Sequence, residues 1–296
     1  MKTTTMTSTA TSLCTLVLLP WLATVGFAAS DVTIDDTLVY PESITALADG
    51  TVIAGSANKP IIYRAGPGQT LAKAWIQLTG QGNVTTLGVL ADTKAKTLWV
   101  CQSEQQEGTP APPRRTILRT FDLKTGKDKQ SYPLPGATNT CNDIAIAADG
   151  TAYISDTANG QILRLKRGGG LELWLQDPSL AGIDGLTFVK GALYVNSVTQ
   201  STILRVPMNK DGSAGTPVLI ALSQPVGRPD GMREQAGRLF VAENGSGKVS
   251  ELKLEGDKAT VVVIKEGFIT PTAVQPVGKI LWVGEAKFAY RRDPKL

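Results

Sequence analysis

The sequence contains no histidine among its 296 residues. That absence excludes Ser-His-Asp and Cys-His catalysis, histidine general bases and ordinary catalytic zinc sites. Cysteine is also scarce, and its three positions are Cys14, Cys101 and Cys141. Because Cys14 lies in an apolar leader described below, two cysteines remain. They form either a disulfide, in an oxidising compartment, or two unpaired buried thiols.

Clusters of charge of one sign are missing too. The chain has 30 Lys and Arg against 26 Asp and Glu, a formal net charge of +4. The only tight basic pairs are Arg114-Arg115 and Arg291-Arg292, and no stretch alternates aromatic with basic residues as a nucleic-acid groove would. We therefore expect no nucleic-acid partner.

Residues 1–29 form a leader that is typical of a secretory signal peptide. Lys2 is its only charge, the run Leu13–Phe27 is apolar, and small residues follow at Ala28-Ala29. The apolar run is too short for a membrane span, and its flanking residues are not those expected of one. The alternative is that the leader stays uncleaved as an anchor. We expect a secreted or periplasmic protein with no stable span after cleavage. Residues 30–296 would then form a single, monomeric domain.

The rest of the chain repeats one unit of strands. In residues 140–165, two apolar runs are joined by Asp149-Gly150 and a third follows, which predicts an antiparallel meander. Residues 50–64 match residues 150–164 nearly position for position. Four further segments follow the same plan: 96–123, 191–206, 237–252 and 278–291.

The spacing of these units predicts the architecture. The first strands begin near Ser43, Leu87, Asp143, Gly185, Gly231 and Thr272. Intervals of about 41 to 56 residues are in the range of propeller blades. A less regular fourth strand follows in most units, as at 171–175, 217–221 and 259–264. We therefore predict an all-β, six-bladed β-propeller of four-stranded antiparallel blades, with an eight-stranded barrel as the alternative. Because the last unit lacks a fourth strand, we expect the N-terminal strand at 32–39 to close the last blade.

Oxygen-bearing side chains recur just before the first strand of four units. In a meander, the loop before the first strand and the loop after the second lie on the same side, so both sets converge on one end of the channel. The first set contains Glu42, Asn142 with Asp143, Asp184 and Asp230, and the second contains Ser56, Gln102, Asp156, Ser197, Glu243 and Glu285. Three carboxylates and an amide in one channel would repel without a cation. Oxygen ligands alone favour Ca²⁺, although other divalent cations would fit and any single residue could instead serve a turn.

Four short motifs carry a resemblance to a known family. They are PES at 41–43, CNDIAIAADGTAYISD at 141–156, IDGL at 183–186 and RPDGM at 228–232. They resemble the motifs of the gluconolactonase and senescence-marker-protein (regucalcin-like) family, whose wider relatives are the paraoxonases and diisopropyl fluorophosphatase. The resemblance covers about residues 32–291. It implies a six-bladed propeller that hydrolyses lactones or related esters at a divalent metal, usually calcium.

The resemblance also implies roles for individual residues. Metal ligands fall at Glu42, Asn142, Asp184 and Asp230, with Asp230 also serving as base or nucleophile. Asp143 would assist catalysis by holding Asn142 or a metal-bound water. Substrate contacts are expected at Asn142, Asp156 and Glu243. The family usually has Asn-Gly where this chain has Asp184-Gly185. The added negative charge should retain the metal but weaken its Lewis acidity.

The expected function is therefore that of a secreted calcium-dependent hydrolase that opens a small-molecule lactone or related ester in the channel. Two alternatives remain. One is a non-catalytic ligand-binding or interaction propeller, and the other is a metal-free propeller similar to strictosidine synthase. The loop at 104–115 leaves a second strand, so it should overhang the channel mouth as a lid or a surface insertion.

Overall fold

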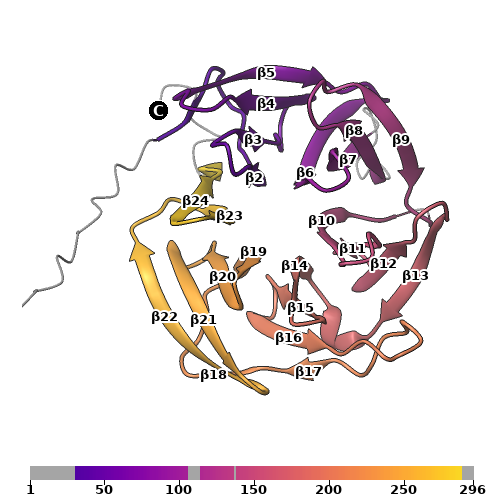
Figure 1. Ribbon diagram of the computed structural model, residues 1–296, viewed down its shortest axis with the longest axis vertical. Coiled ribbons are helices and arrows are strands. Elements are labelled where there is room, and N and C mark those ends of the chain that lie inside the picture. The colour runs from indigo at the N-terminus through magenta and orange to yellow at the C-terminus, as the bar shows by residue number, and fades with distance from the viewer. Residues whose placement is uncertain (1–30, 106–113, 137, 289–296) are drawn as a thin grey trace, which may run out of the picture.

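The computed structural model describes residues 31–105, 114–136 and 138–288, and these form an all-β propeller. Figure 1 shows the sheets arranged in a ring around a central axis. Within the described residues there is no α-helix, and one 3₁₀ turn, η1, spans Pro178–Leu180. No helix in that part of the chain has the length and apolar character that crossing a membrane requires.

Five sheets are complete blades, each built from a meander that runs outward from the channel. The first blade has β2 (Ile44–Ala46), β3 (Val52–Ala54), β4 (Ile61–Ala65) and β5 (Leu71–Gln77). The second has β6 (Asn83–Asp92), β7 (Thr97–Gln105), β8 (Arg114–Asp122) and β9 (Asp128–Pro133). The third has β10 (Cys141–Ile146), β11 (Ala152–Asp156), β12 (Gln161–Leu165) and β13 (Leu171–Gln176). The fourth has β14 (Ile183–Val189), β15 (Ala192–Ser197), β16 (Thr202–Val206) and β17 (Val218–Leu219). The fifth has β19 (Pro229–Gln235), β20 (Arg238–Glu243), β21 (Lys248–Glu255) and β22 (Lys258–Glu266), with β18 (Ala221–Leu222) added in parallel outside β22.

The sixth sheet has two strands in the described part of the chain, β23 (Pro271–Val277) and β24 (Ile280–Glu285). The all-β propeller is confirmed, but among the described residues five sheets rather than the predicted six form complete blades. The ring still closes, because β2 contacts both β6 and β23. The Thr272 hydroxyl also donates to the Pro41 carbonyl at 3.0 Å, which joins the last sheet to the first.

The predicted closure of the last blade by the N-terminal strand is wrong. The strand is shorter than expected, and as β1 (Thr33–Ile34) it pairs in parallel with β5 on the outside of the first blade. The residues that follow β1 are held to the same blade. Asp36 accepts a hydrogen bond from Tyr63 at 2.6 Å and pairs with Lys59. These contacts hold the segment after β1 on the first blade and away from the sixth sheet.

The hairpin turns form as the Asp-Gly pairs predict. In the third blade, Gly150 has φ of +89°, a left-handed conformation that favours glycine. The carboxylate of Asp149 accepts from the Thr151 amide at 2.9 Å, which fixes the turn. The first blade repeats the arrangement with Asp49 and Thr51 at 2.8 Å. These turns place β2 and β10 in equivalent positions beside the channel.

The core lies between neighbouring blades. Most apolar clusters join the facing sides of two sheets; one spans the first and second blades and another the second and third. The second cluster contains a disulfide between Cys101 on β7 and Cys141 on β10, with 5.2 Å between their Cα atoms. Of the two states left open for the cysteines, the structure has the paired one. This disulfide ties two blades together at the strand that carries Asn142.

Candidate metal centre

The candidate site is built on β-bulges in the innermost strands. The pairing register shifts between Cys141 and Ile144 in β10, and between Ile183 and Leu186 in β14. It shifts at the equivalent place in β19. A bulge adds a residue to one strand and turns its side chain away from the regular alternation. Asn142, Asp184 and Asp230 occupy these bulges.

Glycine follows two of the bulged acids because neighbouring inner strands approach closely around the channel. A Cβ on Gly185 would lie 2.6 Å from the Asp230 carbonyl oxygen. A Cβ on Gly231 would lie 2.6 Å from the carbonyl oxygen of Thr272. The Asp-Gly pairs therefore put one carboxylate toward the axis while the next residue leaves room for the adjacent blade.

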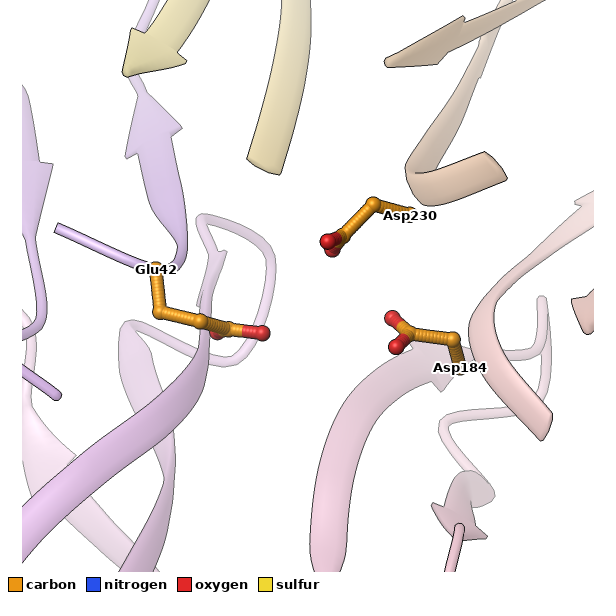
Figure 2. A group of neighbouring side chains, drawn as sticks. All are labelled: Glu42, Asp184 and Asp230. Carbon is orange, nitrogen blue, oxygen red and sulfur yellow. The ribbon is translucent and has the colours of Figure 1, made fainter. Parts of the chain in front are cut away.

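Three carboxylates meet at the channel axis. Glu42 precedes β2, while Asp184 and Asp230 come from β14 and β19, and Figure 2 shows their carboxylates directed toward one another. One oxygen from each lies within 4.8 Å of the others. The cavity that they line has a volume of about 10 Å³, which is roughly the space that one water molecule or ion needs.

Asn142 completes the cluster, and its amide orientation is fixed by its neighbours. Its Nδ2 donates to Asp184 Oδ2 and to Thr157 Oγ1, both at 3.0 Å. The Thr157 hydroxyl donates its own hydrogen to the Ile183 carbonyl at 2.6 Å, so toward Asn142 it can only accept. The amide nitrogen must therefore face Thr157 and Asp184, which leaves the amide oxygen free to act as an acceptor or ligand.

The cluster contains buried oxygens with no hydrogen-bond donor. Glu42 Oε2 and Asp230 Oδ1 are both buried without a partner, although Asp230 Oδ2 accepts from Asn244 at 3.1 Å. Burial, together with the neighbouring carboxylate charges, raises the pKa of Glu42 and of Asp230 well above their usual range. For the same reasons the pKa of Asp184 rises to about 7. A cation would satisfy the unpartnered oxygens and remove the repulsion.

The donor set fits a hard divalent cation. Carboxylate and amide oxygens are the ligands that Ca²⁺ and Mg²⁺ prefer, and the chain has no histidine to offer a softer ion. The structure thus brings together the four residues that the sequence predicted as metal ligands: Glu42, Asn142, Asp184 and Asp230. Their role in binding a metal stays a prediction.

Asp143 faces an arginine that sequence reasoning missed. Arg233 on β19 donates from Nη1 to Asp143 Oδ2 at 2.6 Å and from Nη2 to Oδ1 at 2.8 Å. Both side chains are buried and line the same cavity. Asp143 also accepts from the Leu186 amide at 3.2 Å. Its predicted contact was Asn142 or a water; the carboxylate instead holds Arg233, and a catalytic role for Asp143 stays a prediction.

The sequence carried a signal for Arg233. It stands three residues after Asp230, on an inner strand. At the equivalent places after Asn142 and Asp184, the chain has the small residues Ala145 and Thr187. A long, positively charged side chain at a repeat position where other units have small side chains indicates a specific partner across the channel.

Asp156 and Glu243 are buried but lie outside the residues that line the central cavity. Asp156 accepts from the Thr140 amide at 2.8 Å and from the side chains of Asn159 and Gln161 at 2.7 and 2.8 Å. Glu243 likewise accepts hydrogen bonds from its own blade, including the Gly227 amide at 2.8 Å. These contacts hold the loops in place, and the predicted substrate contacts of both residues are untested. Most of the predicted lid, residues 106–113, lies outside the described residues.

The family comparison matches residues 42–286 to the SMP-30/gluconolactonase/LRE-like region. The matched segment starts at Glu42 and ends one residue after the last described strand, so it contains every residue of the candidate metal centre. The chain belongs to this family. The resemblance inferred from four short motifs is thereby confirmed.

Solved structures support the fold of this family member. A protein provisionally assigned as a gluconolactonase is 18% identical, with a TM-score of 0.66 over 85% of this chain and 87% of the other. A gluconolactonase from Xanthomonas campestris is 19% identical, with a TM-score of 0.63 over 85% of each chain. Virginiamycin B lyase from Staphylococcus aureus is 15% identical, with a TM-score of 0.58 over 85% of this chain and 93% of the lyase. No curated protein sequence matches the chain significantly.

Proposed function

We propose that the protein is a metal-dependent hydrolase that opens a lactone or a related ester in the central channel, with Ca²⁺ as its cation. The observation that carries this proposal is the set of buried, mutually repelling carboxylates with unpartnered oxygens, Glu42, Asp184 and Asp230. Membership of the SMP-30/gluconolactonase/LRE-like family supports the same conclusion. A structural neighbour named as a gluconolactonase agrees with it, although a likeness at 19% identity carries the fold alone.

The chain's own residues would divide the work as follows. Glu42, Asn142, Asp184 and Asp230 would hold the cation, which when bound supplies an electrophile for a carbonyl oxygen. Asp230 is the proposed base as well as a ligand. Its unpartnered Oδ1 would face the cation, while its Oδ2 accepts from Asn244 at 3.1 Å and keeps a second lone pair. That lone pair can take a proton from an attacking water. Burial and the neighbouring carboxylate charges raise the pKa of Asp230, and a higher pKa makes a carboxylate a stronger base.

A lyase of the virginiamycin B type is the alternative that shares the fold. An inactive form of that lyase carries a histidine-to-alanine substitution, whereas this chain has no histidine at all. The same chemistry would therefore need another residue here. A ligand-binding propeller is the second alternative. It would have to hold a cation as well, because buried carboxylates without donors destabilise a scaffold that binds no cation.

The test is hydrolysis of a panel of small lactones by the purified protein, followed by pH-stat with Ca²⁺ and after chelation. We expect turnover that chelation abolishes and that Asp230→Ala reduces by about a hundredfold or more, in the range for losing a general base. The matched control is Asp257→Ala, which removes an exposed carboxylate paired with Arg205 far from the cavity. Turnover that persists in chelator or in Asp230→Ala would refute the assignment.

We also propose that the protein is exported to the periplasm or the medium. The Cys101–Cys141 disulfide supports this, because such bonds persist in oxidising compartments. Residues 1–29, the proposed signal peptide, lie outside the described residues. N-terminal sequencing of the protein from fractionated cells would test the proposal, with cleavage near Ser30 as the expected result and an intact cytoplasmic chain as the contrary one.

A further inference from the structure

The buried ion pair between Asp143 and Arg233 crosses the channel beside the carboxylate cluster. Asp143 is on β10 of the third blade and Arg233 on β19 of the fifth, so the pair spans the fourth blade between them. Both guanidinium Nη atoms engage the two carboxylate oxygens, a bidentate geometry with little freedom. Each residue is at most 7% exposed.

Asp143 occupies a position that glycine fills in the neighbouring strands. It directly follows Asn142 at the β10 bulge, as Gly185 follows Asp184 and Gly231 follows Asp230. The third blade therefore adds a fourth buried carboxylate to a channel that already holds three. With no counter-charge, that carboxylate would compete for any cation in the cavity.

Arg233 supplies the counter-charge. Its geometry indicates that it sets the charge of the cavity rather than adding to the stability of the fold. Its Nε is buried without a partner, which makes the pair a poor source of folding free energy. Its Nη1 also donates to the Met232 carbonyl at 2.9 Å, which holds the side chain against its own strand. The positive charge of the Arg233 guanidinium is thus fixed at one place in the cavity wall.

The two charges of the pair act on the cluster in opposite directions. Burial has the largest effect, raising the pKa of both Glu42 and Asp184. The charge of Asp143 raises both pKa values further, whereas Arg233 lowers both. Asp143, Arg233 and the three carboxylates line the same cavity, so loss of either partner of the ion pair changes the charge that faces the proposed cation position.

We propose that Arg233 is a positioning residue that withdraws Asp143 from the cation and sets the charge of the channel for a single divalent ion. This inference rests on the proposed function, since it assumes that Glu42, Asp184 and Asp230 hold the cation. With the pair intact, the four carboxylates and one guanidinium carry a formal charge of −3 when fully ionised. One bound divalent cation then leaves a net charge of −1. If Asp143 were not paired with Arg233, its carboxylate would be a further ligand for the cation.

The experiment is a Ca²⁺ titration by calorimetry on the purified, chelator-stripped protein, comparing the wild type with Asp143→Asn, Arg233→Met and the double variant. Asp143→Asn leaves an unpaired guanidinium that cannot lose its proton, so Ca²⁺ affinity should fall by roughly tenfold or more. Adding Arg233→Met removes that charge and should restore the affinity to within about threefold of the wild type. A residue that only braced the two strands would not show this recovery.

The single variant Arg233→Met provides a second reading if Asp143→Asn fails to fold. It frees the Asp143 carboxylate, and we expect either roughly tenfold tighter Ca²⁺ binding or uptake of a second ion. The matched control is Arg238→Met, which breaks the bidentate pair of Arg238 with Glu251 on the same blade but outside the cavity. This control should bind Ca²⁺ as the wild type does.

The outcomes separate the two proposals. Wild-type uptake of one Ca²⁺ with recovery in the double variant supports the role of Arg233. Wild-type uptake without that recovery, or an Arg233→Met affinity equal to that of the wild type, overturns the role of Arg233 and leaves the metal site standing. A wild-type protein that takes up no Ca²⁺ overturns the metal site and the role of Arg233 together.

Discussion

Asp184 contributes one of the three carboxylates of the candidate metal centre. Its Oδ2 accepts from Asn142 at 3.0 Å, and its carboxylate lies among those of Glu42 and Asp230. The residue therefore increases both the attraction for a cation and the repulsion in the cation-free site. These two consequences can be measured separately.

We predict that Asp184→Asn weakens Ca²⁺ binding by about tenfold or more while raising the stability of the cation-free protein. The lost charge removes one favourable interaction with the cation and one source of repulsion between buried carboxylates. Calorimetric titration measures the first effect, and thermal unfolding in chelator measures the second. Asp257→Asn, at an exposed ion pair, is the matched control and should change neither. A cation-free melting temperature that falls in Asp184→Asn would contradict the repulsion argument.

Asp156 is predicted to act on stability alone. Its two carboxylate oxygens accept hydrogen bonds from one backbone amide and two side-chain amides. In Asp156→Asn, one amide hydrogen must face a donor, so the free energy of unfolding should drop by about 1–3 kcal/mol. Urea unfolding would measure the loss, and Ca²⁺ titration should give an unchanged affinity. Weaker lactone binding by a normally folded Asp156→Asn would instead support the substrate contact expected from the sequence.

At the scale of elements, each inner strand depends on a bulge and on the close approach of its neighbour. We predict that Gly185→Ala destabilises the protein, because the new Cβ would lie 2.6 Å from the Asp230 carbonyl oxygen and 2.9 Å from the Met232 amide nitrogen. Both contacts are with backbone, so the β14 and β19 strands must move apart. The cost should be in the range of about 1–3 kcal/mol seen for overpacking, together with weaker Ca²⁺ binding because Asp184 and Asp230 separate.

Gly170→Ala is the matched control for this substitution. A Cβ on Gly170 meets nothing within 4 Å, and its φ is not in the left-handed region. Its unfolding free energy should stay the same or rise slightly, since alanine restricts the unfolded chain. Equal stabilities of Gly185→Ala and Gly170→Ala in urea would show that the inner strands are not packed as closely as the bulge geometry requires.

Local patterns predicted the elements that local chemistry determines. The Asp149-Gly150 turn and the strands β10, β11 and β12 follow from short-range preferences, and all of them form as expected. The partner of β1 was mispredicted, because alternation in a two-residue strand says nothing about which edge it will join. That choice depends on Asp36 meeting Lys59 and Tyr63, contacts that only the folded blade creates.

Part of the candidate site could likewise be predicted from the sequence, and part could not. The repeat phase identified Glu42, Asn142, Asp184 and Asp230, because equivalent strands of a ring must bring equivalent positions to one axis. The pairing of Asp143 with Arg233 could not be derived, since it joins residues 90 apart whose side chains meet only when the blades close. The repeat phase grouped Asp156 and Glu243 with the channel end, whereas the structure shows both carboxylates bound to loops of their own blades. Repeat phase does not reveal whether a carboxylate faces the cavity or its own loop.

At the scale of the whole molecule, the closed ring concentrates buried acids that an unfolded chain would keep apart. Folding raises the pKa of Asp184 to about 7 through burial and the Asp143 charge, from an ordinary value of about 4 in the unfolded chain. Between these values the folded, cation-free protein holds a proton that the unfolded chain has released. The contribution of Asp184 to the stability of the cation-free protein is therefore fully present below about pH 4 and is lost as the pH rises through about 7.

We predict that the melting temperature in chelator falls by several degrees between pH 5 and pH 8, and that Ca²⁺ reverses the fall. Because the cation binds the deprotonated carboxylates, the increase in melting temperature on adding Ca²⁺ should be larger at pH 8 than at pH 5. Thermal unfolding of the wild type and of Asp184→Asn at both pH values, with and without Ca²⁺, provides the measurement. The fall should be smaller in the variant, because the contribution of Asp184 is gone while Glu42 and Asp230 keep their raised pKa values. A melting temperature in chelator that rises from pH 5 to pH 8 would contradict the prediction, because protonation of the buried carboxylates would then not stabilise the cation-free protein.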